Sequence, residues 1–524
     1  MSGSTALLSR LQDGFARHFC IPTLFAKNAK RMGHGGDGHG HCAISIAVAA
    51  AALLIFPAAS AQPALAQPAL AQPAPGDFRL LFTGDVMMSR LVKAEIDQRK
   101  TGPWTIFSDL FHSASLVGGN FEGALGDPAK CPAESKLCFA APDAATELMR
   151  QAGFKLVTAE NNHSGDLGQA GRTETRAVFQ QSGLLALDFD GSPQFFRFGE
   201  LTVGFVAVTT IKAADGRIQQ IPSVELAQKL RLARQLANLV VVSIHWGNEL
   251  QDWPTDAQQQ QARWLVEHGA DLIVGHHPHV VQAPACVEGR PVFFSLGNHL
   301  FDQKYAETKD GLIADCSVHA GRLLCGALST HTDEATAFPK LAGKNAAADH
   351  ALAACSPQLG PGAEIGGVSI RPEPWSADQP VNGIILDGFE IDDHGVGKRV
   401  WQSRRQALVS LQLVTTMAAE PLLLSLERHN SSIDDEVGLR PYVYAVGPHG
   451  LIARWRGSAL AWPLIDAVES NDGVLCALHR GDSFLLPDPA TKTTRIAAYR
   501  WNGFGFTGVK TPPECESVLR QSIR

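Results

Sequence analysis

The sequence has no excess of positive charge and no Cys-x-x-Cys pair. Its 45 Lys and Arg residues are outnumbered by 52 Asp and Glu residues, which gives a formal net charge of -7. A chain with this balance and without a long basic run lacks the electrostatic footprint of a protein that binds nucleic acid or a membrane surface. The absence of Cys-x-x-Cys spacing argues against a zinc site built on cysteines.

What the sequence does contain is enough apolar material for a large core. Hydrophobic residues make up 45% of the 524 positions, a composition typical of globular proteins and not of disordered ones. Length alone predicts two or three domains.

The amino-terminal residues have the order of a secretory signal peptide. Basic residues within 27–31 precede an apolar run over 43–56, and small residues follow it up to Ala61. The run of about 14 residues is shorter than the roughly 20 that a membrane span needs. We therefore expect a signal peptide over 1–61 and export to the periplasm or the cell surface. A retained signal anchor is the alternative.

Cysteine usage is consistent with export. Eight of the ten cysteines lie after the signal peptide, and an even number in an exported chain favours disulfides. We expect Cys131 to pair with Cys138 across a short loop. We expect Cys316 to pair with Cys325 across a hairpin that turns at 321–322.

Composition and periodicity divide the chain into five parts, of which the signal peptide is the first. Repeated Ala-Gln-Pro-Ala-Leu units predict an extended linker over 62–77. Apolar strands that alternate with amphipathic helices predict an α/β layered domain. The expected boundaries are an α/β domain over 78–400 with an Ala-, Gly- and Pro-rich insertion at about 330–380, a helical connector over 401–438, and a small β-rich domain over 439–524.

Polar side chains recur where the predicted strands end. The strand that starts at Phe78 ends at Asp85, the next strand is followed by Glu122, and the strand over 154–158 precedes residues 161–163. Open α/β sheets place their sites at the carboxyl ends of strands. Each polar residue alone has an ordinary structural explanation, but their recurrence predicts a functional site.

The same pattern is densest in the middle of the chain. A buried strand over 240–244 precedes His245, and a second strand over 272–274 precedes the histidines of 276–279. An amphipathic helix over 255–269 lies between them in sequence. This strand, helix and strand predict a parallel unit with chemistry at its carboxyl end.

The candidate side chains are oxygen and nitrogen donors that suit Mn, Fe, Zn, Mg or Ca. The predicted metal ligands are Asp85, Glu122, Asn162, His245, His277 and His279. A pair of divalent ions can activate water and stabilise a tetrahedral transition state. His163, beside a predicted ligand, is the candidate catalytic acid that protonates a leaving group. The predicted supporting residues are Asn161, Asp166, Glu249, His276 and Asn298.

Six motifs follow one another between residues 78 and 302. They are Gly84-Asp85-Val86, Asn120-Phe121-Glu122-Gly123, Asn161-Asn162-His163, His245-Trp246-Gly247-Asn248-Glu249, Gly275-His276-His277-Pro278-His279 and Ser295-Leu296-Gly297-Asn298. This order resembles the CapA family of poly-γ-glutamate capsule biosynthesis proteins, which have a calcineurin-like metallophosphoesterase fold. The resemblance implies an α/β fold, a layered β-sandwich with flanking helices, and it does not cover the region after 390.

The resemblance also implies how the ligands divide between two metals. The usual Asp-x-His motif is replaced here by Asp85-Val86-Met87, which removes one imidazole from the first metal. We therefore expect one firm metal, bound by Glu122, Asn162, His245 and His277. The first metal is expected to be weak or absent, with only Asp85, Glu122 and His279. Glu249 or His276 is a candidate replacement for the missing imidazole.

The implied function is a metal-dependent hydrolase or transferase that acts on phosphate or γ-glutamyl linkages of a capsule polymer. The alternative is a non-catalytic, metal-stabilised component of a capsule assembly or export complex that binds a polyanion. The expected partners are an anionic polymer or its precursor and membrane-bound capsule synthesis proteins, without nucleic acid. Arg90 is either a solvated helix residue or a group that attracts an anionic substrate.

Overall fold

The computed structural model describes residues 78–99, 101–133, 135, 137–333, 336–380, 382–432, 435–457, 460–481 and 494–521. These residues belong to one compact unit. The predicted signal peptide and linker, and a strand expected at 483–486, lie outside the described residues. Within the described ranges, no helix combines the length and the apolar character that a membrane crossing requires.

Strand β1 (Phe78–Val86) is central to an eight-stranded sheet. The other strands are β2 (Leu116–Phe121), β5 (Leu156–Thr158), β6 (Leu185–Leu187), β15 (Asn298–Leu300), β16 (Asp310–His319), β17 (Arg322–Thr332) and β18 (Pro339–Lys344). Their order is β18-β17-β16-β1-β2-β5-β6, and β15 pairs with the end of β1. The pairing is parallel from β1 to β6, so that these strands end at one edge of the sheet.

A second sheet of six strands repeats this arrangement. Its strands are β7 (Gln194–Phe198), β8 (Leu201–Thr209), β9 (Leu239–His245), β10 (Leu272–His276), β12 (Ala285–Val287) and β13 (Arg290–Phe293). The order is β12-β13-β10-β9-β8-β7, parallel in its centre and antiparallel at both edge pairs. The predicted strands before His245 and His276 are therefore adjacent.

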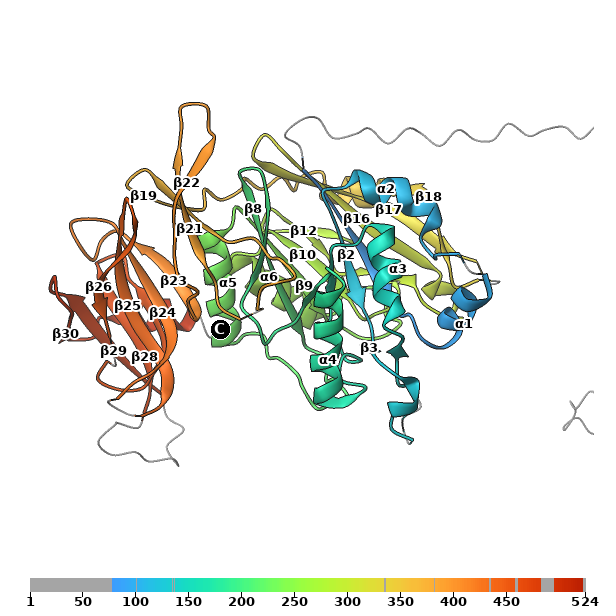
Figure 1. Ribbon diagram of the computed structural model, residues 1–524, viewed down its shortest axis with the longest axis horizontal. Helices are drawn as coiled ribbons and strands as arrows, with labels where there is room; N and C mark the ends of the chain where they lie inside the picture. Colours follow the sequence, from blue (N-terminus) through green and yellow to red (C-terminus); the bar gives the residue numbers. More distant parts are fainter. Residues whose placement is uncertain are drawn as a thin grey trace, which may run out of the picture. The chain divides into compact units, whose positions relative to one another are not determined.

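The two sheets pack face to face, because successive side chains of a strand point to opposite sides. Leu80 and Phe82 of β1 share an apolar cluster with Val241 of β9 and Val274 of β10. Leu81 belongs instead to a cluster with helices. The predicted layered β-sandwich with flanking helices is confirmed (Figure 1).

Helices cover the outer faces of both sheets. Those on the first sheet are α1 (Arg90–Arg99), α2 (Ser108–Ser113), α3 (Ala144–Ala152) and α4 (Gly168–Gln181), and those on the second are α5 (Val224–Leu236) and α6 (Asp256–Glu267). Helix α5 starts after Ser223, whose side chain accepts a hydrogen bond from the backbone of Leu226. Helix α6 starts at a capping box formed by Thr255 and Gln258.

Short elements complete the α/β region. They are β3 (Ala124–Leu125), β4 (Ala140–Ala141), β11 (Val281–Gln282), β14 (Ser295–Leu296) and the 3₁₀ helices Thr105–Phe107, Pro128–Lys130 and Ala306–Thr308. Pairs β3-β4 and β11-β14 are separate two-stranded sheets. Both pairs lie in loops that follow strands of the sandwich.

The segment over 330–380 is structured, contrary to the expected surface insertion. It contains the end of β17, strand β18, α7 (Ala346–Leu352), β19 (Ala363–Ile365) and β20 (Val368–Pro372). Strands β19 and β20 join β21 (Leu386–Ile391) and β22 (Gly397–Gln402) in a four-stranded sheet. Ala348 and Leu352 of α7 are buried in the cluster between the two large sheets. Small apolar residues therefore pack here despite the weak periodicity.

The expected helical connector over 401–438 is wrong, because this segment forms strands. It contains β23 (Leu408–Val414), β24 (Leu422–Asn430) and the start of β25 (Val437–Gly447). Leu422, Leu423 and Leu424 are all buried, since both faces of β24 are covered. A short, continuous apolar run of this kind cannot be distinguished from a buried helix by periodicity.

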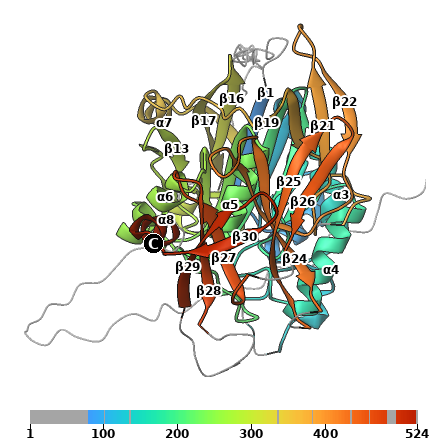
Figure 2. The ribbon, with the colours of Figure 1, turned by 90° about the vertical axis from the view of Figure 1, so that its left-hand side faces the viewer.

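The carboxyl-terminal sheet is β-rich as expected, but it starts at Leu408 and not at 439. The remaining elements are β26 (Gly450–Arg456), β27 (Leu464–Glu469), β28 (Val474–Arg480), β29 (Thr494–Trp501), β30 (Phe506–Val509) and α8 (Pro513–Gln521). Leu411 and Leu423 share an apolar cluster with Leu230 of α5. Figure 2 shows the strands of this sheet in front of α5. The sheet is therefore not a separate unit.

Four disulfides connect the eight cysteines of the described region. The expected pairs Cys131–Cys138 and Cys316–Cys325 are both present. Cys286–Cys355 joins β12 to the segment after α7, and Cys476–Cys515 joins β28 to α8. Both further pairs link positions distant in sequence, which sequence spacing does not predict.

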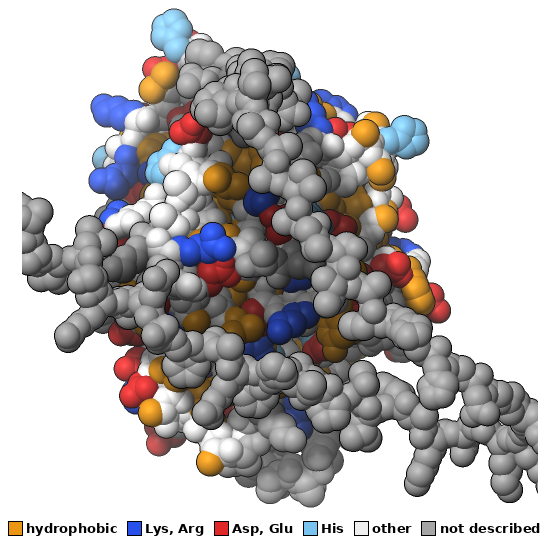
Figure 3. All heavy atoms as spheres, turned by 90° about the vertical axis from the view of Figure 1, so that its right-hand side faces the viewer, with side chains coloured by type: hydrophobic (Ala, Val, Ile, Leu, Met, Phe, Trp, Pro, Cys, Tyr) orange, Lys and Arg blue, Asp and Glu red, His pale blue; other side chains and the backbone are white. Residues whose placement is uncertain are grey.

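One face of the protein carries acidic and basic side chains interspersed with each other (Figure 3), in agreement with the nearly balanced totals.

An ion pair between α5 and the carboxyl-terminal sheet should contribute strongly to stability. Arg231 lies 2.9 Å from the fully buried carboxylate of Asp466. We expect Asp466→Ala to lower the free energy of unfolding by about 3 kcal/mol, because Arg231 loses its partner. Urea denaturation measures this change.

The exposed pair of Arg454 and Glu420, 2.8 Å apart, is the control. Glu420→Ala should cost less than about 1 kcal/mol, because water screens an exposed pair. Equal losses for the two variants would show that the Asp466 pair does not hold the sheet to α5.

Candidate metal centre

The close approach of β1 to the loop before β15 organises the site. The backbone N–H of Asp85 donates to the carbonyl of Gly297 over 3.0 Å. A Cβ atom on Gly84 would lie 2.0 Å from the same carbonyl oxygen, so only glycine fits there. The motifs that contain Gly84 and Gly297 thus meet, which brings Asn298 beside Asp85.

Asp85 is fully buried at the end of β1. Its Oδ1 lies 2.9 Å from Nδ2 of Asn120 and 3.1 Å from Nδ1 of His276, and its Oδ2 lies 3.3 Å from Nδ1 of His279. Burial raises the pKa of Asp85, but the hydrogen bonds from His276 and His279 outweigh burial and hold this pKa well below its ordinary value. Asp85 therefore stays ionised inside the protein.

Glu122 is the second buried carboxylate. Its Oε1 lies 3.5 Å from Nε2 of His279 and has no hydrogen-bond partner in the described structure. Burial raises the pKa of Glu122 to about 8, against the opposing effect of His279. An unpaired buried carboxylate oxygen is costly unless a proton or a cation is bound to it.

Two histidines after β10 have strained backbones. His277 has a φ angle of 100° and His279 one of 61°, in the left-handed region that residues with a Cβ rarely adopt. Burial lowers the pKa of His277 to about 3, and its Nδ1 has no partner within the described structure. The nearby Glu122 and Asp85 outweigh burial and raise the pKa of His279 to about 9.

Asn162 and His245 form a direct pair beside these groups. Oδ1 of Asn162 lies 2.8 Å from Nε2 of His245. The ring of His245 lies 4.8 Å from the ring of His277, centroid to centroid. Burial, with His277 second, holds the pKa of His245 well below its ordinary value. Neutral imidazoles of this kind are suitable metal ligands.

His163 is oriented by a carboxylate and an aromatic ring. Oδ2 of Asp166 accepts from Nδ1 of His163 over 2.9 Å, and it also accepts from the backbone N–H of Phe139 over 2.7 Å. Phe139 stacks on His163 with ring centroids 3.8 Å apart. Nε2 of His163 therefore points toward the centre, 3.9 Å from Oε1 of Glu122.

Two groups of side chains could each hold an ion. Asp85, Glu122 and His279 form one, and Glu249, His277 and His279 form the other, with the ligand atoms of each group within 4.8 Å of one another. The unpartnered atoms Oε1 of Glu122 and Nδ1 of His277 belong to these groups. A divalent cation would satisfy such atoms, so the donor set fits a metal.

The structure brings all the predicted site residues together, but it groups them differently from the expected division. The set expected to be weak, Asp85, Glu122 and His279, is one of the two compact groups. In the set expected to be firm, Asn162 and His245 bind each other. Glu249, a predicted replacement ligand, completes the second group.

At position 87, where the usual Asp-x-His motif has its histidine, this protein has a methionine. Met87 is fully buried in the apolar cluster around α1, and its sulfur accepts from the hydroxyl of Ser89. His276 instead contacts Oδ1 of Asp85 from the second sheet.

Two residues of the site were not among the predicted set. Nδ2 of Asn120 contacts Asp85 and lies 3.4 Å from Nδ1 of His245, while its Oδ1 accepts from Asn161 over 3.0 Å. The position of Asn120, two residues before Glu122 in a polar motif, was a usable signal. Phe139 follows a disulfide loop and carries no sequence signal for its role.

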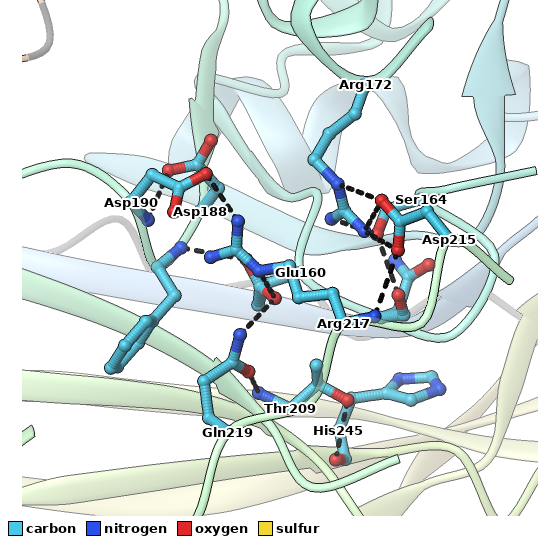
Figure 4. Close-up of polar contacts among 12 residues, drawn as sticks. Glu160, Ser164, Arg172, Asp188, Asp190, Thr209, Asp215, Arg217, Gln219 and His245 are labelled. Carbon is cyan, nitrogen blue, oxygen red and sulfur yellow. Dashed lines mark hydrogen bonds and ion pairs between the residues drawn. The ribbon is translucent and has the colours of Figure 1, made fainter. Parts of the chain in front are cut away.

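A polar network supports the loop that carries Asn162 and His163 (Figure 4). Arg172 of α4 donates to Ser164 over 2.6 Å and to Oδ2 of Asp215 over 2.9 Å. The hydroxyl of Ser164 in turn donates to the carbonyl of Asn161 over 2.7 Å. Helix α4 and the turn at Asp215 therefore hold this loop in place.

The connection between β8 and α5, which contains this turn, also contacts His245 at the end of β9. The backbone N–H of Thr210 donates to the carbonyl of His245 over 2.9 Å. Gln219 donates to the buried carboxylate of Glu160 over 2.9 Å, and Arg217 lies 3.3 Å from it. Burial raises the pKa of Glu160, with Arg217 opposing it. One connection between β8 and α5 thus supports both partners of the Asn162–His245 pair.

Comparison with known proteins identifies relatives of the α/β region. Residues 79–303 match the family model described as bacterial capsule synthesis protein PGA_cap. The PGA biosynthesis protein CapA of Bacillus subtilis is 28% identical over 251 residues, 44% of this chain. The capsule biosynthesis protein CapA of Bacillus anthracis is 31% identical over 259 residues, 45% of this chain. The family resemblance inferred from the motifs is confirmed.

These matches cover parts of both proteins. They span 65% and 62% of the two relatives, so the chain covers less than two thirds of either. A novel phosphatase from Mycoplasma pneumoniae aligns with 51% of this chain and 94% of its own, with 15% identity and a TM-score of 0.29. Chaetomium thermophilum Vps29 aligns with 51% of this chain and 95% of its own, with 13% identity and a TM-score of 0.23. Neither structural score supports an argument about function.

His279 should be the ligand on which metal binding depends most. It belongs to both groups, so loss of its imidazole removes a ligand from each of them. We expect His279→Ala to weaken binding of Mn²⁺ or Zn²⁺ by more than about a hundredfold. Glu249→Gln should have a smaller effect, because Glu249 is exposed and belongs to one group.

Elemental analysis and metal titration measure both effects. His350→Ala, at an exposed position in α7, is the control and should bind metal normally. An unchanged affinity in His279→Ala would contradict the shared-ligand arrangement.

Metal affinity should rise with pH. Glu122, with a pKa of about 8, and His279, with a pKa of about 9, hold protons at neutral pH when no metal is bound. These protons compete with the ion below the two pKa values and leave as pH rises through them. Titration calorimetry at about pH 6.5 and pH 8.5 should show tighter binding at the higher pH, with proton release at the lower one. Binding that is independent of pH would exclude these two residues as ligands.

Proposed function

We propose, from the match of residues 79–303 to the bacterial capsule synthesis family PGA_cap, that the protein is a metal-dependent hydrolase or transferase of capsule polymer biosynthesis. Its proposed substrates are phosphate or γ-glutamyl linkages of the polymer or of a precursor. The observation that carries this proposal is the position of His163 beside a donor set that fits a metal.

The side chains around His163 divide the proposed reaction between them. The metal, when bound, would polarise the reacting group and lower the pKa of water. Asp166 accepts from Nδ1 of His163 and fixes the ring orientation, so that Nε2 faces the centre and the imidazolium form would donate its proton from there to the leaving group. Phe139 covers one face of the ring and prevents it from turning away. Asn161 accepts from the backbone N–H of His163 over 3.1 Å and fixes the loop.

We also propose that the protein is exported and works in the periplasm or at the cell surface, by cleavage of its signal or by a retained anchor. The four disulfides support this location, because disulfides persist in oxidising compartments. Proposed partners there are an anionic polymer and membrane-bound capsule synthesis proteins. Cell fractionation with detection of the protein in the cytoplasm alone would contradict the location.

A second candidate is binding of an anionic polymer without turnover. The observation that favours it is the direct hydrogen bond between Asn162 and His245, which occupies two atoms expected to bind a metal. Polymer binding that survives His163→Ala but is lost on His277→Ala, without any cleavage, would support this candidate over the hydrolase.

The hydrolase proposal predicts a specific loss on removal of the acid. Purified protein with Mn²⁺, Zn²⁺, Fe²⁺ or Mg²⁺ should cleave an aryl phosphate or a γ-glutamyl peptide, and a chelator should stop the reaction. His163→Ala should lower kcat by about a hundredfold to ten-thousandfold, because the leaving group loses its proton donor. Its metal content should stay at the wild-type level.

Two comparisons make this experiment decisive. His350→Ala should retain full activity, since His350 lies on α7, outside the candidate centre. The absence of metal-dependent cleavage of both substrates by wild-type protein, or full activity of His163→Ala, would refute the hydrolase proposal.

A further inference from the structure

Arg90 lies against the aromatic side chains that border the candidate centre. Its Cζ is 4.4 Å from the ring centroid of Phe139 and 6.0 Å from that of Phe301. Phe139 stacks on His163, and the ring of Phe301 lies 4.8 Å from that of His279. We call Phe139 and Phe301 the aromatic shelf. The guanidinium is therefore separated from both histidines by one aromatic ring.

The position of the Arg90 side chain is fixed. Its Nη2 pairs with Oδ1 of Asp302, whose side chain is only 7% exposed. Oδ2 of Asp302 accepts from the backbone N–H of Leu91 over 3.2 Å, which holds the carboxylate in place. Attraction between a guanidinium and an aromatic face adds to this restraint.

Donor atoms of Arg90 remain available to a ligand. A guanidinium has five N–H groups, and in the described structure only Nη2 of Arg90 has a hydrogen-bond partner. The side chain is 33% exposed. Nε and Nη1 are therefore free to bind a further oxyanion.

The backbone at Arg90 is also unusual. Its φ angle is 50°, in the left-handed region, as is the case for His277 and His279 of the centre. Such strain in residues other than glycine concentrates at functional sites, where the surrounding structure maintains it.

Arg99, at the other end of α1, has contacts of the same kind as Arg90 and serves as a comparison. It pairs with Glu95 over 2.6 Å and lies 5.5 Å from the ring of Phe338. An arginine with a carboxylate partner and an aromatic neighbour is thus not unusual in this chain. What distinguishes Arg90 is that its aromatic neighbours contact His163 and His279.

We propose that Arg90 binds a carboxylate of the substrate next to the reacting bond. The planar guanidinium fork matches a carboxylate in a bidentate arrangement. A γ-linked glutamate chain carries one free α-carboxylate on each residue, so a carboxylate lies beside every amide bond. The inference rests on the proposed function for the identity of the polymer, but the binding of an anion by Arg90 does not require turnover.

Equilibrium binding tests this role directly. The full-length protein with Mn²⁺ is titrated with an oligo-γ-glutamate of about ten residues and with the same oligomer after amidation of its carboxylates. Wild-type protein should bind the anionic oligomer more tightly, and the difference should shrink at high salt. Arg90→Gln should weaken anionic binding by about tenfold to a hundredfold and leave binding of the amidated oligomer unchanged. Arg90→Lys should retain part of the affinity, because it keeps the charge without the fork.

Two further variants separate recognition from a structural role. Arg99→Gln is the matched control and should bind like wild type. Asp302→Asn leaves the charge of Arg90 unneutralised, so anionic binding should persist or become tighter even though the pair is broken. If Arg90 were only structural, Asp302→Asn and Arg90→Gln would lower binding alike, which would overturn the proposal.

The remaining outcomes are equally decisive. Wild-type affinity in Arg90→Gln, or no binding of the oligomer by wild type, would overturn the proposal. Binding of inorganic phosphate alone with dependence on Arg90 would replace the carboxylate by a phosphate and overturn the assignment. Binding of the oligomer that depends on Arg90, without any cleavage, would contradict the hydrolase proposal and leave this inference standing.

Discussion

The burial of two carboxylates, Asp85 and Glu122, is the constraint on which the centre depends. Removal of a charge from water costs several kcal/mol unless hydrogen bonds or an opposite charge compensate. Asp85 is compensated by Asn120, His276 and His279. Glu122 is not, because one of its oxygens lacks a partner in the described structure. The centre therefore has too little positive charge to balance its carboxylates. The raised pKa values of Glu122 and His279 mean that, without a metal ion, both residues hold protons that supply this charge.

The β-sandwich makes this arrangement possible because strands of both sheets end at the same place. Asp85 and Asn120 are adjacent through the parallel pairing of β1 with β2, and His245 and His276 through that of β9 with β10. The group of Asp85, Glu122 and His279 needs both sheets, because its carboxylates lie at the ends of β1 and β2 while His279 follows β10. The contact between His276 and Asp85 is likewise a contact between sheets. Packing of the two sheets therefore brings the residues of the centre together.

Sequence reasoning succeeded where the signal was local and failed where it depended on packing. Asp85 and His245 were predictable because each directly ends an apolar run, and the strand before it fixes its place at the sheet edge. The grouping of Glu249 with His277 was not, because it depends on how two loops lie against each other. The role of Phe139 depends on a loop closed by a disulfide. The leucine-rich run of β24 was misassigned to a helix because both of its faces are buried.

The carboxyl-terminal sheet contacts the supports of the centre although the family match ends at 303. Helix α5 covers the second sheet with one side, and its other side meets β23 and β27, where Gln228 and Arg231 bind Asp466. Gln235 also accepts from the backbone of Leu413 over 3.0 Å. Helix α5 follows directly on the connection that supports Asn162 and His245. Removal of the sheet would expose apolar residues of α5 and leave that connection anchored at one end, so the sheet stabilises the centre without contributing a ligand.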